Sequence, residues 1–79
     1  MRIDKFLKVS RLIKRRTVAN DACDAGRISV NGHLVKASYD VKTGDVIEIA
    51  FGTRVVKAKV TSLQESIRKE EASDMYQLL

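Results

Sequence analysis

The sequence predicts one α+β domain, in which two short N-terminal helices pack on a small twisted antiparallel sheet and a short helical tail follows. Apolar residues recur at helical spacing up to Gly26, alternate with polar residues beyond it, and return to helical spacing near the C-terminus. The 79 residues contain no proline, low-complexity tract or internal repeat. We therefore expect a domain over residues 1–65 and a tail over residues 66–79.

The first helix is expected to end near Ser10, with Ile3, Phe6 and Leu7 on its buried face. Asp4 is a candidate cap for this helix, because its carboxylate can accept hydrogen bonds from the free backbone N–H groups of the first turn.

The second helix is expected to begin after Thr17 as its N-cap. Its packed face is small and apolar, and consists of Val18, Ala19, Ala22 and Cys23. Gly26 is placed to end this helix, since glycine adopts the left-handed conformation without a Cβ penalty.

The alternating segments predict strands over residues 28–30, 33–35, 46–51 and 54–63. Asn31 and Gly32 separate the first two strands and favour a type I′ hairpin turn. Gly44 and Asp45 indicate another turn. Over residues 66–79 the helical stripe consists of Ala72, Met75, Tyr76 and Leu79.

Several classes of protein are disfavoured by composition. Cys23 is the only cysteine, so it forms no intrachain disulfide, and beside small residues it is expected to be a packed apolar side chain. His33 has no clustered metal-binding partner, and no catalytic triad, P-loop or dinucleotide loop is present. We expect a non-enzymatic, monomeric binding module without a cofactor or metal. Without a signal peptide or apolar run, it is expected to be soluble and cytoplasmic, with no membrane partner.

Basic residues are concentrated at the N-terminal end. Residues 1–36 hold nine of the 15 lysines and arginines and only three acids, whereas the rest of the chain is slightly acidic within a net charge of +5. This asymmetry favours a polyanion partner over an ordinary solvated face. The candidate RNA-binding residues are Arg2, Asp4, Lys5, Lys8, Arg11, Lys14, Arg15, Arg16 and Arg27. For Arg27, stabilisation of the preceding helix end is an equal alternative.

The two helices could also form a DNA-binding helix-turn-helix, but the second helix lacks the side chains that read base edges. Only Asn20 fits that role, and Asp21 and Asp24 would repel phosphate. Basic residues beside a packed helix pair are better suited to recognising the backbone and shape of structured RNA.

Four segments together resemble the S4 RNA-binding domain, namely residues 2–7, 10–19, 26–32 and 41–45. The resemblance implies two short helices against a twisted sheet (the αL motif), with RNA held on the helix face. It places Arg2, Lys5, Arg11 and Arg16 toward RNA. Asp4 is unusual on such a surface, and two roles remain open for it: capping the helix, or orienting a neighbouring arginine.

The chain is also similar to the stand-alone members of this family that act in bacterial ribosome quality control. That resemblance implies contacts with ribosomal RNA and peptidyl-tRNA on an obstructed large ribosomal subunit. It further implies a partner that adds C-terminal alanine tails to stalled chains. The alternatives are a heat-shock-type ribosome-recycling factor, whose long basic extension is not expected here, or an RNA-targeting accessory of a modification enzyme.

Overall fold

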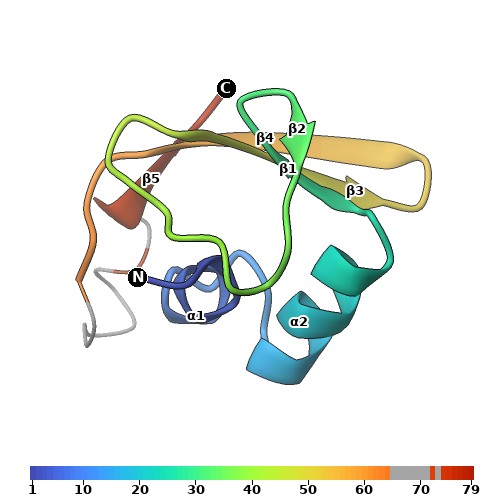
Figure 1. Cartoon of the computed structure of the whole chain (residues 1–79). Coiled ribbons are helices and arrows are strands. Elements are labelled where there is room, and N and C mark those ends of the chain that lie inside the picture. Colours follow the sequence, from blue (N-terminus) through green and yellow to red (C-terminus); the bar gives the residue numbers. More distant parts are fainter. Residues whose placement is uncertain (65–71, 73) are drawn as a thin grey trace.

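The computed structural model describes residues 1–64, 72 and 74–79, and shows two helices on one side of an antiparallel sheet (Figure 1). The helices are α1 (Ile3–Val9) and α2 (Arg16–Asp24). The strands are β1 (Ile28–Val30), β2 (His33–Leu34), β3 (Val46–Phe51), β4 (Arg54–Val60) and β5 (Tyr76–Leu78). Their order in the sheet is β2-β1-β3-β4-β5. The predicted α+β class is confirmed.

The core lies between the two layers. Ile3, Phe6 and Leu7 of α1 are fully buried, as predicted, and they belong to one cluster with Ile47 and Ile49 of β3. In β3 and β4 the buried residues alternate with more exposed ones, which is the pattern of a sheet with one face on the core. One wall of the molecule is therefore the pair of helices, and the opposite wall is the outer face of the sheet.

The connection between the helices is held against α1. The helix ends at Val9, and the backbone N–H of Ile13 donates to the Leu7 carbonyl at 3.0 Å. Between these residues Arg11 has a φ of 63°. This left-handed conformation is normally occupied by glycine or asparagine at a helix end, so Arg11 is an unusual residue for this position.

The C-terminal end of α2 confirms the prediction for Gly26, whose φ is 72°. Its N–H donates to the Cys23 carbonyl, and the N–H of Arg27 donates to the Ala22 carbonyl, which is the Schellman arrangement.

The predicted start of α2 is wrong. Arg15 is the N-cap and has extended backbone, so Thr17 already lies within the first turn, and no side chain caps this end. Val18 is also misplaced in the prediction, because half of its side chain is exposed while Ala19 and Cys23 are buried.

The turn between β1 and β2 has positive φ at both Asn31 and Gly32, as a type I′ hairpin requires. Asn31 also joins the neighbouring strand: its Oδ1 accepts from the Val46 N–H at 3.0 Å, and its own N–H donates to the Val46 carbonyl at 2.8 Å.

The predicted C-terminal helix over residues 66–79 is wrong at its described end. Tyr76–Leu78 form strand β5, which pairs with β4 in the register Ala58 with Leu78. The free edge of β4 supplies backbone partners for this strand, and Met75 just before it is fully buried. Residues 65–71 and 73, which carry the rest of that prediction, lie outside the described part of the chain.

Candidate RNA-binding surface

The predicted RNA-binding residues of the N-terminal segment lie on α1, on the start of α2 and on the connection between them. Most of their cationic side chains are exposed, and Lys5 is half-buried. The exposed ones are Arg2, Lys8, Arg11, Lys14, Arg15 and Arg16.

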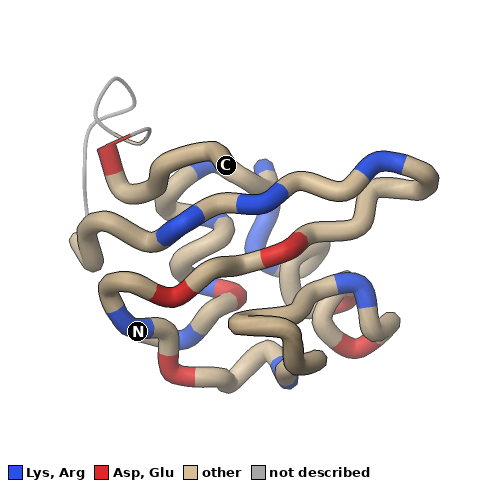
Figure 2. Tube along the Cα trace, turned by 90° about the horizontal axis from the view of Figure 1, so that it is seen from above, with Lys and Arg blue, Asp and Glu red and all other residues tan. Residues whose placement is uncertain are grey.

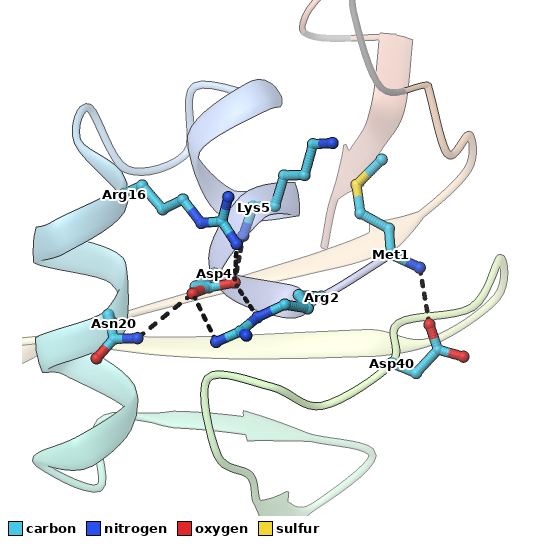
Figure 3. Close-up of polar contacts among 7 residues, drawn as sticks. All are labelled: Met1, Arg2, Asp4, Lys5, Arg16, Asn20 and Asp40. Atoms are coloured by element: carbon cyan, nitrogen blue, oxygen red, sulfur yellow. Dashed lines mark hydrogen bonds and ion pairs between the residues drawn. The ribbon is translucent and has the colours of Figure 1, made fainter.

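Asp4 is the centre of this surface, because side chains from three places in the chain converge on its carboxylate (Figure 3). Arg2 donates through Nε to Oδ1 at 3.2 Å and through a terminal nitrogen to Oδ2 at 3.3 Å. Arg16 donates to Oδ1 at 3.4 Å, and Asn20 donates to Oδ2 at 3.4 Å. We call these four residues the Asp4 cluster.

The Asp4 side chain is only 3% exposed, whereas the Arg2 and Arg16 side chains are 51% and 48% exposed. The carboxylate therefore lies beneath the two guanidinium groups and faces little solvent. Arg2 and Arg16 each keep further N–H donors that can reach an incoming phosphate.

The pKa of Asp4 follows from these contacts. Burial by itself raises the pKa of the carboxyl group, but hydrogen bonds from Arg2, Asn20, Arg16 and the Lys5 backbone N–H together lower it below its ordinary value. Asp4 is therefore charged at neutral pH and attracts the two arginines. Of the two roles left open for Asp4, the structure supports the orienting pair. The N-cap of α1 is Arg2, although Asp4 accepts one first-turn N–H, that of Lys5, at 2.8 Å.

Asn20 belongs to this cluster, although the sequence did not identify it as part of an RNA surface. It follows Arg16 by four residues, so both side chains lie on the same face of α2. With Asp4, Thr17 and Asp21 they line a shallow hollow of about 300 Å³. Helical spacing from Arg16 was the available signal, but it did not reveal that the buried anion would be Asp4.

The position of Arg2 is further determined by the N-terminus. The Met1 ammonium group contacts Asp40 Oδ1 at 2.7 Å (Figure 3). The Ile3 N–H donates to the Tyr39 carbonyl at 2.8 Å. The hydrogen bond from the ammonium group holds the pKa of Asp40 below its usual value. These contacts hold the backbone on both sides of Arg2 against the loop before β3.

Arg27 is not part of the Asp4 cluster. It lies beyond the other end of α2 and lines a separate groove with Phe51. Cys23 is buried, and burial raises the pKa of its thiol to about 11, so it behaves as the packed apolar residue that was predicted. The described residues include no group of three or more His, Cys, Asp and Glu side chains placed to hold a metal ion. Neither described helix has the length and apolar character needed to cross a membrane.

The outer face of the sheet carries a different pattern of charge. Seen from above, its strands show both basic and acidic segments (Figure 2). Lys57 Nζ contacts Glu48 Oε1 at 3.2 Å, so on this face an acidic side chain offsets one of the basic ones.

The chain is similar to known proteins in sequence and in structure. Residues 1–47 match the S4 domain family. The chain is 56% identical over 79 residues to the "RQC P-site tRNA stabilizing factor" of Bacillus subtilis, covering all of this chain and 92% of that one. It is 55% identical over 78 residues to the factor of the same name from Halalkalibacterium halodurans, covering 99% and 89%.

A solved structure of Vibrio cholerae Heat Shock Protein 15, described as trimeric, superimposes with a TM-score of 0.92 at 26% identity. The superposition covers all of this chain and 81% of the Heat Shock Protein 15 chain. The segment that matches the S4 domain family, residues 1–47, contains α1, α2 and the whole Asp4 cluster. The chain therefore belongs to the S4 domain family of RNA-binding proteins and, within it, to the family of RQC P-site tRNA stabilizing factors.

Proposed function

We propose that this protein is a non-enzymatic RNA-binding factor of bacterial ribosome quality control that acts in the cytoplasm. It binds obstructed large ribosomal subunits that carry peptidyl-tRNA, through contacts with ribosomal RNA and tRNA. It thereby supports the addition of C-terminal alanine tails by an RqcH-type factor, while peptide transfer is left to the ribosome.

The observation that carries this proposal is the Asp4 cluster. A buried carboxylate holds two half-exposed guanidinium groups in position, and more exposed cations extend the surface along the connection to α2. A preorganised pair of arginines suits the phosphates of structured RNA, because each guanidinium can bind phosphate through two hydrogen bonds. The relatives' name supplies the particular RNA, a P-site tRNA, and the quality-control context.

The direct test is co-sedimentation with large subunits that carry peptidyl-tRNA, compared with empty ones. We expect the wild type to sediment with the former and much less with the latter. Arg2→Ala and Arg16→Ala should each weaken binding by about tenfold, and both should reduce alanine tailing. Affinity should also fall steeply with salt, because each phosphate contact releases counterions.

The matched control is Lys59→Ala, which removes one positive charge from the sheet. Lys59 is exposed and alternates with the buried Ala58 and Val60, so it points away from the helices. It should leave binding within about twofold. Equal losses for Lys59→Ala and Arg2→Ala, with unchanged folding, would show that net charge alone governs binding. Equal sedimentation with empty subunits would contradict the peptidyl-tRNA requirement.

A second candidate is ribosome recycling of the heat-shock type, which the close structural match to Heat Shock Protein 15 favours. The two functions differ in the product. In a reconstituted stalled-subunit reaction, quality control predicts longer alanine tails when the protein is added. Recycling predicts release of the subunit's tRNA without tail extension.

A further inference from the structure

An apolar groove lies between α2 and the end of β3, apart from the Asp4 cluster. Its volume is about 250 Å³. Val18 and Phe51 line it and are unusually exposed for large apolar side chains, at 50% and 45%. Ala22 of α2 and the C-cap residue Ala25 also line the groove, and their small side chains leave the space open.

Charged residues surround this groove. Arg27 and Asp21 line it. Arg54 lies opposite Phe51 in the register of β3 and β4, so both side chains leave the same face of the hairpin. Arg27 and Asp21 therefore lie at the groove itself, and Arg54 adds a second guanidinium group on the side of the hairpin where Phe51 lies. This excess of positive charge favours an anionic partner that has an apolar part.

The groove adjoins the hollow of the candidate RNA-binding surface. Asp21 lines both this groove and the hollow that contains Asp4, Arg16 and Asn20. An RNA strand whose phosphates lie on the Asp4 cluster would pass the entrance of the groove along α2. A nucleotide of such a strand has the required chemistry, because its base has an apolar π-face and its phosphate is an anion.

We propose that the groove binds one unpaired nucleobase of the bound RNA. The base lies against the Phe51 ring and the Val18 side chain, and the adjoining phosphate lies near Arg27. Asp21 accepts a hydrogen bond from an amino or imino group on the edge of the base. This inference rests on the proposed function, since it assumes that RNA occupies the Asp4 cluster.

The groove gives a role to Arg27, which the Asp4 cluster leaves without one. Arg27 is a cation of the RNA-binding set that has no contact with Asp4 among the described residues, and here it neutralises a phosphate. Stacking on an aromatic ring contributes to RNA affinity whichever base is present, because every base has a π-face. An apolar protein segment would fill the same space, but it would not use the guanidinium group of Arg27.

The first test is site-specific photo-crosslinking with large subunits carrying peptidyl-tRNA. A photoreactive p-benzoylphenylalanine replaces Phe51, or in the control Val55, which is 60% exposed on the opposite face of the same hairpin. The proposal predicts a crosslink from position 51 to an unpaired nucleotide and no RNA crosslink from position 55. A crosslink from position 51 to a protein would overturn it. So would the absence of any RNA crosslink from a variant that still co-sediments.

The second test uses a short RNA hairpin with one unpaired nucleotide, and the same hairpin with an abasic nucleotide at that position. Both probes keep every phosphate and differ only in the base. The wild type should bind the first probe about tenfold more tightly. Phe51→Ala should abolish that preference, and Val55→Ala should keep it.

Equal affinity of the wild type for the two probes would overturn the nucleobase groove. A different result would contradict the proposed function, namely that the wild type does not bind subunits carrying peptidyl-tRNA. Since the hairpin comparison needs no ribosome, the two failures are distinguishable.

Discussion

Two acidic residues of this protein form ion pairs of the same length and serve different purposes. Asp4 contacts Arg2 at 3.2 Å on the helix layer, and Glu48 contacts Lys57 at 3.2 Å on the outer face of the sheet. The Asp4 side chain is 3% exposed, whereas that of Glu48 is 34% exposed. A pair in solvent contributes little to stability, while a buried anion orients the cations above it. Burial, and not distance, distinguishes the two regions.

The largest expected effect is that of Asp4→Asn. Removing the charge leaves Arg2 and Arg16 without the anion that orients them, so binding to subunits carrying peptidyl-tRNA should weaken by about tenfold. The free energy of unfolding should fall by about 1–3 kcal/mol, measured by urea unfolding, because a buried hydrogen-bonded charge is lost.

The control for Asp4→Asn is Glu48→Gln, which raises the net charge by the same amount. If net charge governed RNA affinity, both substitutions would tighten binding. Tighter binding by Asp4→Asn would therefore contradict a positioning role for Asp4.

Acid should remove from the wild type the stability that the charged Asp4 carboxylate contributes. The pKa of Asp4 is lowered in the folded protein, so its stabilising effect is complete above the pKa of about 4 in the unfolded chain. The effect is lost as the pH falls through the lower pKa of the folded state. The gap in unfolding free energy between wild type and Asp4→Asn should therefore narrow as the pH falls from neutrality to below the unfolded pKa of about 4. A gap that stayed constant would show that the pKa of Asp4 is the same in both states.

Replacing Arg11 by glycine should have smaller effects, which are opposite in sign for stability and for RNA binding. Its φ of 63° favours glycine, so Arg11→Gly should raise the free energy of unfolding by about 0.5–1 kcal/mol in urea unfolding. Subunit binding should weaken about threefold through loss of one cation. Arg11→Ala should weaken binding equally without the gain in stability. Unchanged binding in both variants would remove Arg11 from the RNA-binding surface.

The smallest effects belong to the sheet. Lys57→Ala and Glu48→Gln should each change the free energy of unfolding by less than about 0.5 kcal/mol, because their pair is partly exposed. Subunit binding should stay within about twofold of the wild type for both. A tenfold loss in either variant would extend the RNA-binding surface to the outer face of the sheet.

Local patterns were sufficient to predict much of the fold. Ile3, Phe6 and Leu7 are buried because their spacing places them on one face of a helix, and the Asn31–Gly32 turn follows from the two residues that tolerate positive φ. The bounds of β3 agree with the prediction because apolar residues alternate along this segment, as they do in a strand with one buried face. The cluster of basic residues also indicated RNA before any contact was known.

Long-range packing decided the rest. Val18 fits the apolar stripe of α2, but in the folded chain it lines an open groove beside Phe51 and stays half exposed. The segment at Tyr76 has helical periodicity, yet it forms a strand because β4 offers an unpaired edge and the core accepts Met75. Such competition between local propensity and tertiary partners is invisible in a window of sequence.

For the candidate site, the sequence by itself determined which end of the molecule is cationic and which residues supply the charge. Only the tertiary structure decided that Asp4 lies beneath the two arginines. Its carboxylate contacts Arg16 and Asn20, which follow it by 12 and 16 positions in the sequence and meet it only when α2 packs against α1. A carboxylate among basic residues is ambiguous as a pattern. Its burial makes it the anion on which the arginines are oriented.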